Sequence, residues 1–122
     1  ESGLVATPRD LAKIGMLVLR SEQSASPLLS AEWRARFFSA PVPASVTEFT
    51  GRDWGYRAGW WIVLRPDGHH DITAIGHFGQ LIYVSPRNNT VIVRTGGDER
   101  APNDRDLAAL FFALSDQLSA SI

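Results

Sequence analysis

The sequence predicts an α+β fold in which two helices precede an antiparallel meander of three to four strands and one helix closes the chain. Three observations predict it. Apolar residues recur at helical spacing near both ends, short runs rich in aromatic and β-branched residues fill the middle, and turn signals separate those runs. Strands joined by tight turns run antiparallel, and separate groups of helices and strands are typical of α+β folds.

The composition fits one compact unit. The chain has 122 residues, of which 44% are hydrophobic, and a formal net charge of -1 without a basic block, so we expect no nucleic-acid partner. There is no cysteine, which excludes disulfides, thiolate metal sites and thiol nucleophiles. The longest apolar run, residues 14–19, is far shorter than the roughly 20 residues of a membrane span, so we expect none.

Two helices are predicted in the N-terminal half. Thr7 can cap the first, Pro8 suits its first position and Asp10 completes a capping-box variant, so this helix should run from 8 to about 20. Its surface is largely apolar and needs neighbours on several sides. After a polar loop, Ser30 caps a short helix to about residue 38, and a second loop follows to about residue 53. Residues 1–53 therefore form a helical segment.

Residues 54–122 should form the sheet half. The predicted strands cover 55–64, 72–78, 80–84 and 90–94, and the Arg-Pro-Asp-Gly turn at 65–68 joins the first two. Asn103 or Asp104 then caps the closing helix. Five apolar residues of that helix share one stripe that should lie on the sheet: Leu107, Leu110, Phe111, Leu114 and Leu118.

The densest candidate site is the run 76–80, which reads GHFGQ. Glycine inside a strand marks a bulge or a close approach of a ligand or another backbone, and a kinked strand end can present backbone amides. The plain alternative is a corner between two strands with a half-buried His77. The local sequence leaves both interpretations open.

Three sequence segments with motif-like patterns follow one another along the chain. Residues 2–15 read SGLVATPRDLAKIG, residues 54–61 read WGYRAGWW, and residues 74–94 read AIGHFGQLIYVSPRNNTVIVR. Together they resemble motifs of the serine β-lactamase-related hydrolases, the family of class C β-lactamases, penicillin-binding-protein-like esterases and 6-aminohexanoate-dimer hydrolase relatives. The resemblance covers nearly the whole chain and implies a β-lactamase/transpeptidase-like fold and acyl hydrolysis.

Two motifs of that family are missing. In the family an S-x-x-K motif supplies the nucleophile and its base, and the Tyr of a Y-x-N motif assists proton transfer. Here the residue three before Lys13 is Asp10, and neither Tyr56 nor Tyr83 has Asn two residues later. The family places both motifs upstream of the phrase that opens this chain, and the chain begins at Glu1 without an initiator Met. The resemblance implies the C-terminal part of a longer hydrolase, inactive by itself.

The third family motif, K-T-G, is present in altered form. Aligned with residues 74–76, it places the backbone N–H of His77 where the family completes its oxyanion hole, and the imidazole need not take part. An alternative register takes residues 77–79 as an H-x-G variant and assigns the role to the N–H of Gln80. The first register is preferred because residues 79–80 then fall on the GQ of the family.

The resemblance implies which residues line the site. His77, through its amide, and Gly76 are the catalytic positions, and the substrate-binding positions are Ala74, Phe78, Gly79 and Gln80. Ala74 replaces the family's Lys and removes the charge that would hold a β-lactam carboxylate. We therefore expect a small ester or amide substrate rather than a penicillin, with no metal and no cofactor.

Other patterns point less clearly to chemistry. Residues 69–71 read HHD and evoke a zinc site, but neighbouring residues of a hairpin point to opposite faces, which favours a solvated turn. Residues 95–98 read TGGD but lack the Gly-Lys-Ser/Thr signature of a phosphate loop. The aromatic residues of 54–61 could stack on sugars or bases, yet Tyr56 and Trp60 share one strand parity, which favours core packing.

Two functions follow from these patterns. The first is the C-terminal segment of a serine acyl-hydrolase that supplies one wall of the active site. The alternative is a stand-alone, non-catalytic α+β binding or scaffold domain. The expected partners are the missing N-terminal part of the same protein or a second copy that pairs through an open sheet edge. The sequence leaves localisation open between the periplasm and the cytoplasm of a bacterium.

Overall fold

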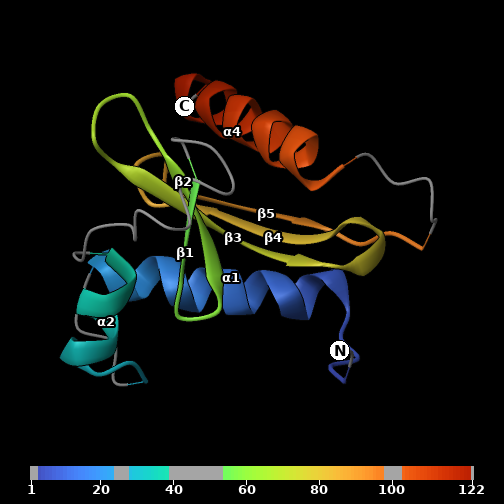
Figure 1. Ribbon diagram of the computed structural model, residues 1–122, viewed down its shortest axis with the longest axis horizontal. Coiled ribbons are helices and arrows are strands. Elements are labelled where there is room, and N and C mark those ends of the chain that lie inside the picture. Colours follow the sequence, from blue (N-terminus) through green and yellow to red (C-terminus); the bar gives the residue numbers. More distant parts are fainter. Residues whose placement is uncertain (1–2, 24–27, 39–53, 98–102, 122) are drawn as a thin grey trace.

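The computed structural model describes residues 3–23, 28–38, 54–97 and 103–121 and shows the predicted α+β arrangement, with five strands in one antiparallel sheet. Helix α1 lies on one face of the sheet and helix α4 on the other (Figure 1). The elements in chain order are α1 (Pro8–Gln23), α2 (Ala31–Phe38), β1 (Trp54–Arg57), β2 (Trp60–Leu64), β3 (His70–Gly76), the 3-10 turn η1 (His77–Gly79), β4 (Gln80–Ser85), β5 (Thr90–Arg94) and α4 (Asp104–Ala120).

The strands follow one another in the sheet in chain order, as a meander from β1 to β5. The fifth strand arises because the run predicted as one strand, 55–64, is a hairpin. Ala58 and Gly59 have φ values of 50° and 87°, the left-handed pair that a two-residue hairpin turn requires. The prediction that Tyr56 and Trp60 share a face is therefore wrong. Tyr56 contacts Trp61 on the α4 side, whereas Trp60 packs into the core under α1.

Helix α1 begins as predicted. The N–H of Asp10 donates to Thr7 Oγ1 at 3.2 Å, and the Thr7 hydroxyl donates to the Asp10 carboxylate at 2.7 Å. The helix continues past the predicted end near residue 20 to Gln23, and the buried Ser21 satisfies its hydroxyl within the helix by donating to the Leu17 carbonyl at 2.6 Å. Residues 24–27 of the predicted loop lie outside the described residues.

The close approach of α1 to the sheet depends on Gly15. A Cβ at this position would stand 2.5 Å from Cγ1 of Val91 in β5 and 3.0 Å from Cγ2 of Ile82 in β4. The helix backbone therefore rests directly on these two side chains. Val18 and Leu19 complete this contact as buried members of the core beneath the helix.

The second helix also begins as predicted, since the N–H of Trp33 donates to the Ser30 hydroxyl at 3.2 Å. Of the loop predicted after α2, residues 39–53 lie outside the described residues. The turn predicted at 65–68 is present, with the N–H of Gly68 bonded to the Arg65 carbonyl at 3.1 Å. Both features are local, and both were readable from the sequence.

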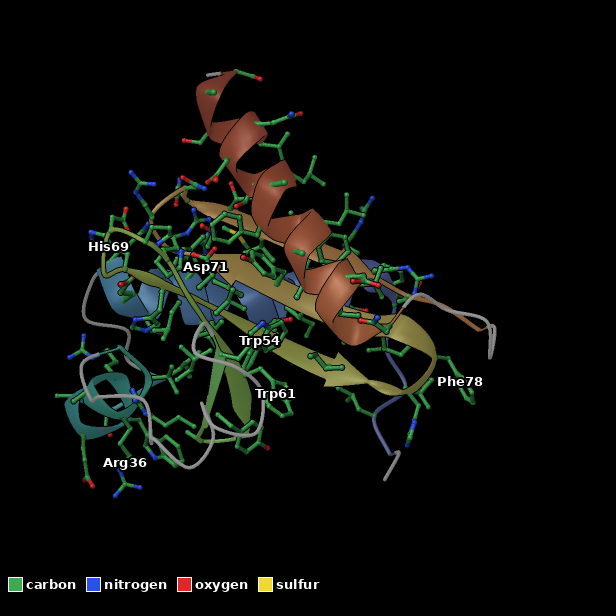
Figure 2. All side chains as sticks on the ribbon, turned by 45° about the horizontal axis from the view of Figure 1, so that its top comes forward. Arg36, Trp54, Trp61, His69, Asp71 and Phe78 are labelled. Carbon is green, nitrogen blue, oxygen red and sulfur yellow. The ribbon has the colours of Figure 1, made fainter. Side chains whose placement is uncertain are left out.

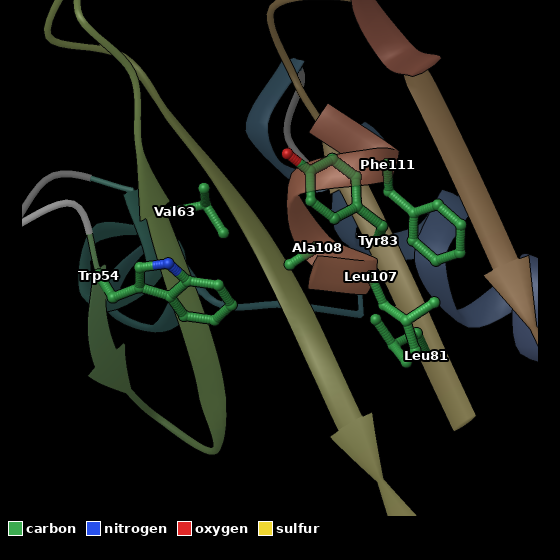
Figure 3. Close-up of a cluster of buried hydrophobic side chains, with 7 residues drawn as sticks. All are labelled: Trp54, Val63, Leu81, Tyr83, Leu107, Ala108 and Phe111. Atoms are coloured by element: carbon green, nitrogen blue, oxygen red, sulfur yellow. The ribbon is translucent and has the colours of Figure 1, made fainter. Parts of the chain in front are cut away.

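Helix α4 is capped by Asn103, whose side chain accepts from the N–H of Asp106 at 3.0 Å. Only part of the predicted stripe lies on the sheet. Leu107 and Phe111 are buried with Ala108 against the strands (Figure 3), but the other three leucines, Leu110, Leu114 and Leu118, are exposed. The side of α4 that faces the sheet includes Ala108, Phe112 and Ser115 in place of these leucines.

Candidate functional site

The predicted site lies at the corner between β3 and β4, at the end of the sheet where Phe78 projects (Figure 2). The two strands remain paired up to Gly76 and Gln80, and the three residues between them form η1. Gly76, His77 and Phe78 are exposed, whereas Gly79 is buried. The corner therefore presents the end of β3 to solvent and packs its last glycine inward.

The backbone of this corner is unusual at Phe78. Its φ and ψ are 59° and 29°, in the left-handed region, and Gly79 follows with a φ of 74°. This conformation costs a residue with a Cβ roughly 1–2 kcal/mol, and residues held in it gather at functional sites. Because the Phe78 ring is 49% exposed, its burial offsets little of this conformational cost. The packing around the corner must hold the conformation.

The side chains of Arg94 and Gln80 support the backbone of the corner. Arg94, at the end of β5, directs Nη1 to the Gly79 carbonyl at 2.6 Å and lies 3.4 Å from the Phe78 carbonyl. The Gln80 amide bonds both backbone groups of Gly96: its Oε1 accepts from the Gly96 N–H at 3.2 Å, and its Nε2 donates to the Gly96 carbonyl. These contacts tie the corner to the segment that follows β5.

Gly96 is required for this arrangement. A Cβ there would overlap the Phe78 carbonyl oxygen and stand 2.7 Å from Nη1 of Arg94. The backbone after β5 can therefore support the corner only where there is no side chain. Its neighbour Gly97 has open space around it, so the restriction belongs to one of the two glycines.

The structure brings five of the six predicted site residues together in the corner and places Ala74 two residues before it on β3. Ala74 packs against the core under α1 and is half-buried. The side-chain amide of Gln80 is engaged by Gly96, so it supports the corner and has no free amide to offer. The backbone N–H of Gln80 donates to the His77 carbonyl. The exposed groups are those of Gly76, His77 and Phe78.

A second cluster, which the sequence analysis missed, lies at the opposite end of β3 (Figure 2 labels Asp71). The guanidinium of Arg65 is buried there and binds two carboxylates. Its Nε and Nη2 lie 3.0 and 2.6 Å from Oδ2 of Asp71, and its Nη1 lies 2.8 Å from Oδ1 of Asp116 on α4. The ring of Phe112 covers the guanidinium at 4.1 Å from Cζ. We call this set, with Tyr83, the Arg65 cluster.

Tyr83 completes the Arg65 cluster by donating its hydroxyl to Oδ2 of Asp71 at 2.7 Å. Burial, and then the Asp71 charge, raise the pKa of Tyr83 far above its ordinary value of 10. Burial acts to lower the pKa of Arg65, but its bonds to Asp71 and Asp116 outweigh it and raise that pKa. Burial acts to raise the pKa of Asp116, and its bonds to Asn88 and Arg65 outweigh it and lower that pKa.

The contacts of the Arg65 cluster are those of a structural junction. It ties the β2–β3 turn to α4, while Oδ1 of Asp71 and Oγ1 of the neighbouring Thr73 are buried without a hydrogen-bond partner among the described residues. Asp71, the carboxylate of the HHD run, is thus committed to Arg65. Among the residues that the structure describes, no group of three or more His, Cys, Asp or Glu could hold a metal ion.

The chain matches no family model, and no curated protein is similar enough in sequence to count as a relative. Within the described ranges, no helix is long and apolar enough to cross a membrane. The case for a function therefore depends on the corner at 76–80 and on the sequence phrases that surround it.

Proposed function

We propose that this chain is the C-terminal part of a serine acyl-hydrolase related to the β-lactamases, and that the backbone N–H of His77 is one donor of its oxyanion hole. The three ordered phrases at 2–15, 54–61 and 74–94 support the family, as does a meander sheet with a helix on each face. The nucleophile and its base belong to the N-terminal part, which also covers the rest of the substrate.

The observation that carries the proposal is the difference between the two candidate amides. The N–H of Gln80 is consumed inside the corner by the His77 carbonyl, so it cannot turn toward a substrate. His77 lies at the exposed start of η1, directly after the extended Gly76 with φ and ψ of −119° and 170°. This supports the register in which residues 74–76 take the place of the K-T-G strand.

The chemistry is acyl transfer. A serine Oγ attacks the substrate carbonyl carbon, the π electrons move to the carbonyl oxygen, and this oxygen becomes an oxyanion. The His77 N–H and the N–H of the serine donate to it while the base takes the serine proton. The oxyanion collapses and expels the alcohol or amine, which receives that proton from the base, and water then cleaves the acyl-serine by the same steps to release the acid. Gly76 has no side chain to obstruct the approaching carbonyl. Ala74 packs under α1 and supplies no positive charge for a substrate carboxylate, which favours a small ester or amide over a penicillin.

Oxyanion donors act by being held in place before charge develops. The supports described above supply that rigidity here, because Arg94 fixes the Gly79 carbonyl and Gln80 fixes Gly96. The exposed ring of Phe78 lies next to the amide, 6.0 Å from the His77 ring between centroids. We expect it to contact the apolar part of a bound ester.

The direct test compares a variant that loses both the N–H and the imidazole of His77 with one that loses the imidazole alone. Proline lacks this group, it suits the first position of a helical turn, and the extended Gly76 before it is compatible with a following proline. In the full-length protein, His77→Pro should lower kcat for a p-nitrophenyl ester about a hundredfold to a thousandfold, the usual effect of losing one oxyanion donor. His77→Ala keeps the N–H and should lose far less.

Equal losses in the two variants, with circular dichroism spectra unchanged, would reject the amide assignment and favour a role for the imidazole. Gly76→Val is a weaker test, since a Cβ at position 76 would stand 3.1 Å from Cβ of Gln80 and disturb the bond to Gly96. The open reading frame tests the family itself. A start codon next to Glu1, with no S-x-x-K upstream, would leave the non-catalytic binding domain as the function.

The isolated 122-residue chain should not turn over p-nitrophenyl acetate or nitrocefin, because acyl transfer of this type requires a nucleophile paired with a base. Lys13, its one lysine, is bound to Asp10 at 2.8 Å on the exposed side of α1. Turnover above buffer that survives repurification would show that the chain carries a catalytic pair of its own.

A further inference from the structure

Two buried oxygen atoms on β3 have no hydrogen-bond partner among the described residues. They are Oδ1 of Asp71 and Oγ1 of Thr73, and neither side chain is exposed to solvent. The large majority of buried polar side-chain atoms in folded proteins have at least one partner, which is either a protein group or an ordered water. Two such atoms on neighbouring side chains therefore point to a bound molecule that contacts both.

The two side chains stand on the same face of the sheet. Alternate residues of a strand project to one side, and their Cβ atoms are roughly 7 Å apart. Tyr83, which belongs to the core under α4, lies directly opposite Thr73 in β4 and donates its hydroxyl to Asp71. Asp71 and Thr73 therefore both lie on the α4 side of β3.

The hydrogen bonds to Asp71 are unevenly divided between its two oxygens. Oδ2 accepts three of them, from Nε and Nη2 of Arg65 and from the Tyr83 hydroxyl. Oδ1, on the same carboxylate, accepts none among the described residues. The Arg65 cluster thus satisfies one side of the carboxylate and leaves the other side to a further donor.

The residues beside these oxygens are mainly apolar. On β2, Val63 lies opposite Asp71 and Trp61 lies opposite Thr73. Figure 3 shows Val63 on one side of β3 and Tyr83 on the other, with Ala108 of α4 close to the same face. Such walls exclude bulk solvent, so a molecule bound here must be small and must satisfy both oxygens by itself.

We propose that one buried water molecule bridges Oδ1 of Asp71 and Oγ1 of Thr73. The water donates a hydrogen bond to Asp71 and accepts one from the Thr73 hydroxyl. Two partners lie within the range of about two to four that buried waters have. Hydrogen bonds of about 2.8 Å let one water join oxygens roughly 4.5–5.5 Å apart, a separation that alternate side chains of a strand can provide. A metal ion takes more ligands than these two oxygens.

The first test uses the sign of a stability change. Thr73→Val keeps the shape of the side chain and removes the hydroxyl. If the hydroxyl holds a water for Asp71, its loss leaves Oδ1 uncompensated, and the ratio of folded to unfolded chain in urea denaturation should fall about tenfold. If the hydroxyl has no partner at all, its removal should leave that ratio unchanged or raise it. Circular dichroism confirms that the variant is folded.

The second test counts the water. Magnetic relaxation dispersion of the water oxygen detects buried waters with long residence times and does not respond to exchanging hydroxyl protons. Thr73→Val should remove one such water, and Thr73→Ser, which keeps the hydroxyl, should retain it. Thr90→Val is the matched control, because the Thr90 hydroxyl donates directly to the Asn88 carbonyl at 2.9 Å, so its loss should not alter the count.

A crystal structure of the chain should show one water within hydrogen-bond distance of both oxygens. A side chain in that position, or a direct bond between Thr73 and Asp71, would overturn the proposal. So would a Thr73→Val variant that is as stable as the unmodified chain, or one that loses stability with no change in the number of buried waters. These results do not bear on the oxyanion assignment, since Asp71 and Thr73 are buried away from the exposed amide of His77.

Discussion

Nη2 of Arg65 lies 2.6 Å from Oδ2 of Asp71, and solvent reaches neither side chain beyond a trace. The pair lies on the inner side of the β2–β3 turn. Asp116 of α4, which follows Arg65 by 51 residues in the sequence, also binds the Arg65 guanidinium. A buried charge whose partner is removed stays buried and uncompensated, which is more costly than the loss of an exposed pair. The Arg65 cluster should therefore be the most sensitive polar site in the fold.

Asp71→Asn should lower the free energy of unfolding by about 3 kcal/mol, the lower end for a broken buried pair, since Asp116 still contacts Arg65. Urea denaturation of the chain measures it. Asp67→Asn is the matched control, because Asp67 forms a half-exposed pair with Arg87 at 2.9 Å and should cost at most about 1 kcal/mol. Similar losses in both variants would show that the cluster does not hold α4 to the sheet.

Tyr83→Phe should make the protein less sensitive to alkali. The pKa of Tyr83 is raised above 10 in the folded chain, so the folded state keeps a proton that the unfolded chain releases. That stability is fully present below pH 10 and is lost as pH rises from there toward the folded value. Urea midpoints from neutral pH to about pH 11 should fall more steeply for the unmodified chain than for Tyr83→Phe. Parallel curves would contradict the assignment.

Gly15→Ala should be destabilising by about 1–2 kcal/mol despite the better helix propensity of Ala, because its Cβ must push Val91 aside. In a Val91→Ala background the nearest obstructing methyl group is absent, and the same change should be neutral or stabilising. The double-mutant cycle from chemical denaturation gives this coupling directly. Additive effects would mean that α1 does not rest on β5 through Gly15.

Gly96→Ala should displace the corner at 76–80, since the new Cβ would overlap the Phe78 carbonyl oxygen. In the isolated chain, the NMR signals of the Gln80 side-chain amide should move and its hydrogen exchange should quicken. In the full-length hydrolase that we propose, a displacement near 1 Å should reduce kcat about a hundredfold. Gly97→Ala has open space and should leave the spectrum and the rate unchanged. If neither Gly96→Ala nor Gly97→Ala changes the spectrum or the rate, Gly96 does not support the corner.

Features set by neighbouring residues were predictable from the sequence. The Thr7–Asp10 cap, the turn at 65–68 and the cap by Asn103 each involve residues within three positions of one another. The hairpin inside 55–64 was missed because Ala58 is not a residue typical of the left-handed conformation, so only Gly59 hinted at the turn. The leucines of α4 showed helical spacing, but spacing alone cannot tell which side of a helix meets the sheet.

The candidate site also has one part that was predictable from the sequence and another that was not. The corner at 76–80 was predictable from its two glycines, which mark an irregular strand end. Its supports were not, because Arg94 and Gly96 reach it from positions about 15 residues away in sequence. The Arg65 cluster was harder still, since Asp71 reads as part of a polar HHD run until Arg65 and Tyr83 are placed beside it.

The chain order of the strands has a consequence for how the protein folds. Each strand pairs with the next one along the sequence, so every step of sheet formation closes only a short loop, which costs little entropy and favours rapid folding. Helix α1 has no such advantage, since it docks on β4 and β5 at the far end of the chain. Its docking must close a loop of more than half the chain. The docking of α1, in which Gly15 meets Val91, therefore costs more loop-closure entropy than any pairing of neighbouring strands.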